Sequence, residues 1–236
     1  CFLTDDPWNP AHAAPWFLEA LPRYDVVFTP RANEDDLRRA GCRRVERLPF
    51  AYAPDVHYPD PPKDDDERRQ FASDLVFIGG ADADRVRWMA PLVAAGFDVA
   101  LYGGYWDRDP ATRRAWRGMA DARTVRKAIG GAAASLCLVR HANRDGHSMR
   151  SYEVPALGGC VLAEDTDDHR SLFGPDNECC RYVTGPDDAA RVLRELLDDG
   201  PARARLAAAS HQRVVEGGHR WADRLETILK VVTDAR

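Results

Sequence analysis

The stretch DLVFIGGADADRVRWMAPLVAAGFDVALYGG, residues 74–104, holds two apolar segments that each run into a pair of glycines. Residues 74–80 and 97–104 have the composition of buried strands, and residues 84–95 carry apolar side chains at helical spacing. The order strand, helix, strand is typical of βα units around a parallel sheet. This stretch therefore predicts an α/β fold with a glycine pair at the carboxyl end of each strand.

The same alternation continues toward the C-terminus. We predict strands over residues 132–139, 159–164 and 180–183, and helices over residues 123–129, 148–157, 187–197, 202–216 and 221–233. Residues 73–218 are therefore expected to form one domain, a parallel sheet flanked by helices. The segment 219–236 is expected to pack back toward the first domain, with one face made of Trp221, Leu225, Ile228, Leu229 and Val232.

A shorter α/β region precedes this domain. Residues 2–5, 25–29 and 45–49 read as strands, and residues 11–21 and 33–40 as helices, so residues 1–50 are predicted to be part of an N-terminal domain. Residues 51–72 are rich in proline and end in a charge run, which favours a linker outside the core. Because the chain begins at Cys1 without Met, we expect a fragment that lacks an upstream segment.

Composition excludes several classes of protein. The 236 residues are 44% hydrophobic and 30% charged, which is typical of globular chains and not of disordered ones. The net charge of −5 argues against nucleic-acid binding, and no apolar run is long enough for an integral membrane segment. The six cysteines lack zinc-type spacing. No leader peptide is visible at the front, so we expect a cytoplasmic protein.

The glycine pairs are the first candidate site. Gly79, Gly80 and Gly103 follow apolar strands, where open α/β sheets bind ligands. Glycine lets backbone N–H groups approach a phosphate closely. For either pair alone, a plain tight turn is the favoured alternative. Neither pair matches the dinucleotide or P-loop fingerprint.

The polar stretch RHANRDGHSMRSYEVPALGG, residues 140–159, leaves a predicted strand and opens a predicted helix. A loop with so many charged and amide side chains is a site candidate. Asp145 can lie in the loop and Glu153 inside the helix, so that both face one cleft. The alternatives are Ser148 as a helix N-cap, Glu153 as an ion-pair partner of Arg150, and His147 as a solvated residue.

These residues resemble a known family. A carboxylate, seven residues and then a Glu at the start of a helix look like the donor motif of retaining GT-B glycosyltransferases. The segment MRSYEVPALGGCVLAE, residues 149–164, is most similar to the CgeB-type spore maturation glycosyltransferase-like family. Further similar segments, in the same order, are residues 25–59, 74–80, 98–106 and 172–178.

The resemblance implies a GT-B fold of two Rossmann-like domains, of which the N-terminal one is incomplete here. It implies transfer of a sugar from a nucleoside diphosphate sugar to an unknown carbohydrate, protein or small-molecule acceptor, with no cofactor and no metal. Glu153 would bind the ribose, and Asp145, in place of the Glu of other members, would face the sugar. Donor binding would also involve Gly79, Gly80, Arg85, Gly103, Asn143, Gly146, His147 and Ser148, and the catalytic residues would be Asp145 and Arg150.

Other interpretations stay open. A metal-dependent GT-A transferase would use the acidic residues 164–168 that follow a predicted strand. A degenerate GT-B module would bind a nucleotide without transferring a sugar. A cysteine or histidine catalyst would use Cys179, Cys180 or His147, but no nucleophile motif supports it. Trp106 is a candidate for base stacking, with surface packing as the alternative. The segment Asp5 to Trp8 is a candidate lining of the cleft, with an ordinary turn as the alternative.

Overall fold

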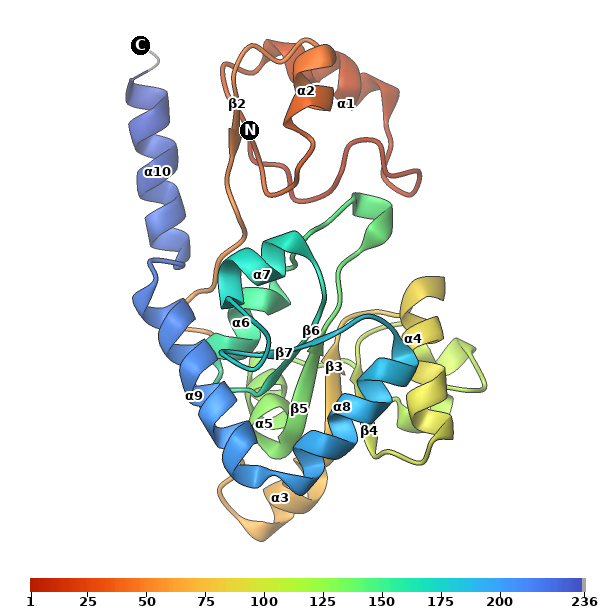
Figure 1. Cartoon of the computed structure of the whole chain (residues 1–236). Helices are drawn as coiled ribbons and strands as arrows, with labels where there is room; N and C mark the ends of the chain where they lie inside the picture. The colour runs from red at the N-terminus through yellow and green to blue at the C-terminus, as the bar shows by residue number, and fades with distance from the viewer. Residues whose placement is uncertain (235–236) are drawn as a thin grey trace.

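The computed structural model describes residues 1–234, so that residues 235 and 236 of the predicted C-terminal segment lie outside the described residues. Figure 1 shows a large C-terminal unit built on one sheet and a small N-terminal unit above it. We call residues 1–50 the N-terminal unit and residues 73–218 the C-terminal unit. Among the described residues, no helix has the length and apolarity needed to span a bilayer.

A five-stranded parallel sheet forms the centre of the C-terminal unit. Its spatial order is β4-β3-β5-β6-β7, so the direction of winding reverses between β3 and β5. In open α/β sheets, ligands bind beyond the carboxyl ends of the strands at such a reversal. The strands are β3 (Ser73–Ile78), β4 (Val99–Tyr102), β5 (Ala132–Cys137), β6 (Val161–Glu164) and β7 (Arg181–Val183). The predicted α/β fold with a parallel sheet flanked by helices is confirmed.

Helices cover both faces of this sheet. The two buried clusters on its faces contain apolar residues of α4 and α8 on one side and of α5 and α6 on the other. The helices are α4 (Ala83–Ala94), α5 (Ala122–Gly131), α6 (Arg150–Ala156), α7 (Asp167–Phe173), α8 (Pro186–Asp198) and α9 (Gly200–Glu216). Single 3-10 turns are η2 (Trp106–Arg108), η3 (Arg113–Ala115) and η4 (His141–Asn143). Helix α7 was not among the predicted helices, and its acidic first turn belongs to the segment 164–168 that a GT-A transferase would use.

The N-terminal unit is a parallel pair of strands with two short helices. It contains α1 (Pro15–Ala20), η1 (Leu21–Arg23), β1 (Val27–Thr29), α2 (Glu34–Arg39) and β2 (Val45–Arg47). A small apolar cluster around Leu21, Val27 and Leu37 holds these elements together. The predicted strand 2–5 is reduced to a single bridge between Phe2 and Phe28.

The predicted linker, residues 51–72, is more ordered than the sequence indicated. Residues 65–71 form α3 (Asp65–Phe71), capped by Asp64, whose carboxylate accepts from the Glu67 N–H. Tyr52 is 3% exposed and Phe71 also 3%, so the expectation that this segment stays out of the core is wrong for these residues. Their aromatic rings join the cluster beneath the sheet because tertiary packing overrides the local composition.

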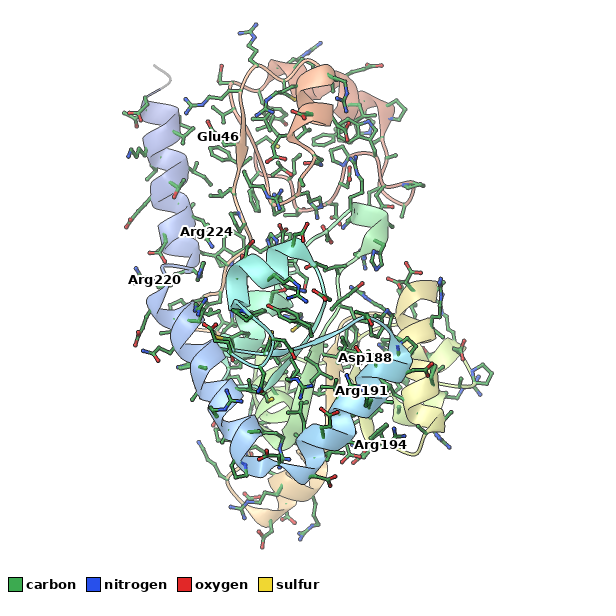
Figure 2. All side chains as sticks on the ribbon, in the orientation of Figure 1. Glu46, Asp188, Arg191, Arg194, Arg220 and Arg224 are labelled. Carbon is green, nitrogen blue, oxygen red and sulfur yellow. The ribbon has the colours of Figure 1, made fainter. Side chains whose placement is uncertain are left out.

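Helix α10 (Trp221–Thr233) runs alongside the N-terminal unit (Figure 1). Ile228 packs on the cluster of Val26, Phe28 and Leu48. Of the predicted apolar face, Leu225 is 57% exposed and Leu229 65% exposed, so these two side chains do not pack on either unit. The first turn of the helix is fastened by Arg224, which lies beside the chain leaving β2 (Figure 2).

Candidate functional site

The loops that follow β3 and β4 approach each other closely at the carboxyl edge of the sheet. The Gly79 N–H donates to the Tyr102 carbonyl over 2.8 Å, and the Ala81 N–H donates to the Gly104 carbonyl over 2.8 Å. Gly103 has a φ of +129°, and a Cβ there would lie 2.5 Å from the Gly79 oxygen. The structure therefore requires glycine at this position for the contact between the two loops, whether or not a phosphate binds there.

Two arginines converge on the end of β3. Arg85, on α4, donates from Nη1 to the Gly80 carbonyl over 2.8 Å, and Arg150, which begins α6, donates from Nε to the Ile78 carbonyl over 3.2 Å. Burial, followed by the positive charge of Arg85, lowers the pKa of Arg150. Burial also lowers the pKa of Arg85, partly offset by Asp82. Both guanidinium groups thus lie partly desolvated at the carboxyl end of β3, and a partly desolvated cation favours an anion beside it.

Arg85 is not a solvated helix residue. Its side chain is 14% exposed, and its Nε is buried without a hydrogen-bond partner among the described residues, 3.7 Å from the Asp82 carboxylate. A buried donor without an acceptor is costly, so it marks a position where an added acceptor would stabilise the protein. The guanidinium also lies 5.4 Å from the centre of the Phe77 ring.

Glu153 lies on α6 and is 8% exposed in its side chain. Its carboxylate forms an ion pair with Arg150, as the sequence allowed, and lies 3.6 Å from Nε2 of His57. Burial, followed by the charge of Arg150, lowers the pKa of His57 to about 4. His57 was not predicted as a site residue. It belongs to the predicted linker, and nothing in the sequence around it indicates that its side chain lies near α6.

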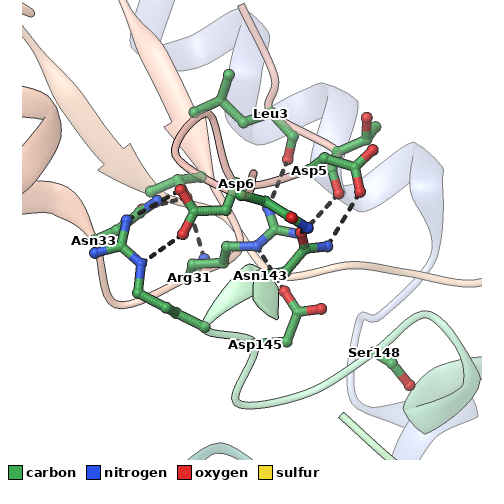
Figure 3. A network of polar contacts seen from close by, with 12 residues as sticks. Leu3, Asp5, Asp6, Arg31, Asn33, Asn143, Asp145 and Ser148 are labelled. Atoms are coloured by element: carbon green, nitrogen blue, oxygen red, sulfur yellow. Dashed lines mark hydrogen bonds and ion pairs between the residues drawn. The ribbon is translucent and has the colours of Figure 1, made fainter. Parts of the chain in front are cut away.

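The loop between β5 and α6 divides into two parts. Asn143 faces the N-terminal unit, where it donates to Asp5 over 3.1 Å and accepts from Asn9 over 2.6 Å (Figure 3). Asp145 forms an ion pair of 2.6 Å with Arg31, a residue that the sequence analysis did not select. Asp5 thus contacts the loop from the N-terminal unit, and its place in the lining of the cleft stays a prediction.

His147 and Ser148 follow on the same loop. His147 is 3% exposed, so the solvated alternative is wrong; its Nδ1 lies 2.8 Å from Asp168, and its Nε2 accepts from the Phe50 N–H over 3.3 Å. The Ser148 hydroxyl is buried and has no partner among the described residues, and Met149 instead occupies the N-cap of α6 without a side-chain cap. Gly146 lies so close to Asp168 that a Cβ would stand 2.6 Å from its carboxyl carbon.

The acidic segment 164–168 does not converge on one point. Asp168 pairs with Arg47 and His147, Glu164 pairs with His141, and Asp165 pairs with Arg170. Within residues 1–234, no group of three or more His, Cys, Asp or Glu side chains is arranged to hold a metal ion. Asp165 and Asp168 are each paired with an arginine and Asp167 lies in the first turn of α7, so this segment forms ion pairs and begins a helix.

The cysteine interpretation and the stacking interpretation of Trp106 are also corrected. Burial raises the pKa of the Cys180 thiol to about 12, whereas a catalytic thiol needs a lowered pKa. Cys179 is buried as well, and burial raises its pKa. Trp106 is 0% exposed and donates from Nε1 to the Gly79 carbonyl over 2.8 Å, so its ring is part of the core.

A cavity of about 380 Å³ lies between the N-terminal unit and the start of α4. Its walls come from residues 9–12, from the first turn of α4 and from the loop after β5. None of the predicted donor residues lines it, although Arg140 at its wall belongs to the same loop as Asn143 and Asp145. This cavity is therefore separate from the site formed by Arg85 and Arg150, neither of which lines it.

Residues 85–230 match the family described as glycosyl transferase-like. Sucrose-phosphate synthase from Thermosynechococcus elongatus is similar in structure, with a TM-score of 0.66 and 18% identity, covering 93% of this chain and 61% of that chain. Anabaena HepE in complex with UDP-glucose gives a TM-score of 0.71 and 10% identity, covering 99% of this chain and 71% of that chain.

The phage T4 BGT in complex with UDP-glucose gives a TM-score of 0.63 and 14% identity, over 87% of this chain and 62% of that chain. The chain thus spans about three fifths of the length of the synthase and of the phage protein. At these identities the matches show the fold, which is that of GT-B glycosyltransferases. A search of curated proteins found no match.

Proposed function

Because the chain belongs to the glycosyl transferase-like family, we propose that it transfers a sugar from a nucleoside diphosphate sugar to an acceptor. The observation that carries the proposal is the convergence of Arg85 and Arg150 at the end of β3. The Ser148 hydroxyl, two positions before Arg150 in the chain, is buried and has no hydrogen-bond partner among the described residues. The neighbours that hold UDP-glucose share this fold. We also propose that, within the glycosyl transferase-like family, the chain is most similar to the CgeB-type proteins.

The chemistry follows from the charge on the leaving group. As the bond between the sugar carbon and the diphosphate oxygen breaks, the oxygen keeps the electron pair and the diphosphate gains negative charge. We propose that Arg85 and Arg150 stabilise that charge without a metal ion, and that the Ser148 hydroxyl donates to the diphosphate. In a retaining reaction the acceptor hydroxyl then bonds to the sugar carbon on the same face, and its proton passes to the diphosphate.

Glu153 fits the role of ribose partner. Its carboxylate is buried, ion-paired to Arg150 and next to His57, so that it is held in place before a ligand binds. The two ribose hydroxyls would donate to the Glu153 carboxylate. Arg150, which pairs with that carboxylate, would also contact the diphosphate, so the ribose and the diphosphate would lie on either side of Arg150. His57 contributes as a neutral neighbour of that carboxylate.

A second candidate is a module that binds the nucleotide without transfer. The observation that favours it is the Asp145 carboxylate, which is 7% exposed and paired with Arg31 before any sugar is present. The two candidates differ in turnover. Release of free nucleoside diphosphate from the nucleotide sugar, coupled to loss of the sugar, supports the transferase; binding without release supports the module.

The test is a calorimetric and thermal-shift comparison of UDP, ADP, GDP, CDP and dTDP, each with and without EDTA. A ligand that binds only the folded state raises the melting midpoint by mass action. We expect one nucleotide to bind independently of EDTA. Arg85→Gln should weaken it about tenfold or more, because a hydrogen bond to a charged group contributes roughly 1.5–3 kcal/mol.

Arg87→Gln is the matched control for this test. Arg87 lies on the same helix but its side chain is 76% exposed and paired only with Asp84, so affinity should stay within about twofold of the unmodified protein. Glu153→Gln should weaken nucleotides more than inorganic diphosphate, since it removes the ribose contact. If no nucleotide binds, or if Arg87→Gln is as damaging as Arg85→Gln, the donor-site assignment is wrong.

A further inference from the structure

Arg31 joins the N-terminal unit to the loop that carries Asp145. It lies in the loop that follows β1, and its side chain is 1% exposed. Nε lies 2.6 Å from Oδ1 of Asp145, while Nη2 donates to the Thr4 carbonyl over 2.7 Å and Nη1 to the Leu3 carbonyl over 3.4 Å. Figure 3 shows the guanidinium held between these backbone oxygens and the carboxylate. Arg31 is thus fixed at both ends.

We infer that Arg31 is a positioning residue for the donor sugar, holding the Asp145 carboxylate ionised and aimed at the position next to the diphosphate. This inference rests on the proposed function. It adds a residue from the N-terminal unit to a site whose other members come from the C-terminal unit and the adjoining segment.

The geometry around Asp145 supports this role. One carboxylate oxygen takes the contact with Arg31, and the other points away from the polar network, on the side where Ser148 lies (Figure 3). The negative charge of Asp145 also acts on Arg85, one of the two arginines at the proposed diphosphate site. With the diphosphate at Arg85 and Arg150, as proposed, we place the attached sugar at the outward oxygen of Asp145.

The positive charge of Arg31 favours the ionised form of Asp145, which packing alone would not do. Burial raises the pKa of Asp145, and Arg31 is the largest opposing influence, followed by the charge of His147. Arg85 faces the carboxylate from α4. Without Arg31, the carboxylate would take up a proton at higher pH and would lose its ability to accept two hydrogen bonds from a sugar.

The experiment compares Arg31→Gln with Arg144→Gln as the matched control. Arg144 also ties the loop to the N-terminal unit, through Asp6 at 2.5 Å and through Asp36, but it does not pair with Asp145. Both variants remove one interface cation. Only the Arg31 variant changes the charge next to Asp145.

Two readouts are used, affinity for UDP against UDP-glucose by calorimetry and the pH dependence of kcat/KM for sugar release or transfer. With Arg31→Gln we expect UDP affinity to stay within about threefold and UDP-glucose affinity to fall about tenfold, because only the sugar contact is lost. The acid limb of kcat/KM should move upward by about one pH unit, since that limb reports the ionised carboxylate. Arg31→Lys should restore most of both properties.

Arg144→Gln should lower the melting midpoint without moving the acid limb or the ratio of the two affinities. Asp145→Asn should abolish the acid limb, and adding Arg31→Gln to Asp145→Asn should produce no further loss of kcat. This double variant also keeps the test valid if Arg31→Gln alone fails to fold, because both members of the buried pair are then neutral.

The inference is overturned if Arg31→Gln and Arg144→Gln behave alike, or if the effects of Arg31→Gln and Asp145→Asn simply add. A different result would count against the proposed function itself. In that case the unmodified protein would bind neither UDP nor UDP-glucose, nor any other nucleotide of the first screen, and the variants would have nothing to change.

Discussion

At the scale of single residues, Gly146 is a position of the candidate site where a neighbouring side chain leaves no room for a Cβ. The Asp168 carboxylate that faces it is held by His147 over 2.8 Å and by Arg47 over 2.7 Å. A Cβ at position 146 would lie 2.6 Å from the Asp168 carboxyl carbon, so this carboxylate would have to leave both partners. The need for glycine here comes from a neighbour on α7.

Gly146→Ala should therefore destabilise the protein by about 1–3 kcal/mol, the usual cost of overpacking. The measurement is the free energy of unfolding in urea. Gly104→Ala is the control, since a Cβ there meets nothing within 4 Å, and it should stay within about 0.5 kcal/mol of the unmodified protein. Equal effects of the two substitutions would contradict the assignment.

At the scale of elements, α10 is attached through its first turn more than through its apolar face. Arg224 is 9% exposed and donates to the carbonyls of Pro49, Phe50 and Gly218 over 3.0, 3.2 and 3.1 Å. Farther along, Leu225 and Leu229 remain exposed. The Trp221 N–H also donates to the Tyr52 carbonyl over 3.0 Å, so the start of α10 joins the chain leaving β2 through this guanidinium and through backbone hydrogen bonds.

Arg224→Met should cost about 1–3 kcal/mol, because it leaves buried carbonyls without donors. It should also speed amide hydrogen exchange over residues 221–233. Arg220→Met is the matched change, because Arg220 is 50% exposed and pairs with Asp223; it should cost under about 1 kcal/mol. Unchanged exchange in the Arg224 variant would mean that α10 is held by other contacts.

At the scale of the whole molecule, a buried neutral histidine links stability to pH. His169 is 0% exposed; its Nδ1 lies 2.7 Å from the Glu164 carbonyl and its Nε2 lies 2.8 Å from the Ser151 hydroxyl. Burial lowers the pKa of His169 from 6.5 to about 4. The unfolded chain therefore binds a proton near neutral pH that the folded chain refuses, and stability falls as pH falls below about 6.5.

Between pH 7.5 and pH 5 this group should remove about 2 kcal/mol from the free energy of unfolding, at about 1.4 kcal/mol for each unit of pKa difference. Urea unfolding at the two pH values measures the loss. His169→Gln should flatten the dependence by about that amount, whereas His12→Gln, whose side chain is 45% exposed, should leave it unchanged. Part of the dependence should remain, because burial also lowers the pKa of His57 to about 4, but a dependence of unchanged size in His169→Gln would contradict the assignment.

The strands of the C-terminal sheet and the ion pair on α6 could be predicted from the amino-acid sequence alone. The apolar runs and glycine pairs identified the five strands of the C-terminal sheet, and the Arg150 to Glu153 spacing anticipated their ion pair on α6. These features depend on residues close along the chain. Periodicity and spacing report such features directly.

The contacts between residues from distant segments of the chain could be known only from the folded structure. Arg31 and His57 reach Asp145 and Glu153 from 114 and 96 positions away in the chain, the differences 145 − 31 and 153 − 57. The core position of Trp106, the burial of Tyr52 and the exposure of Leu225 likewise follow from which surfaces pack together. Burial and long-range electrostatic contacts depend on the folded arrangement, so no local pattern could specify them.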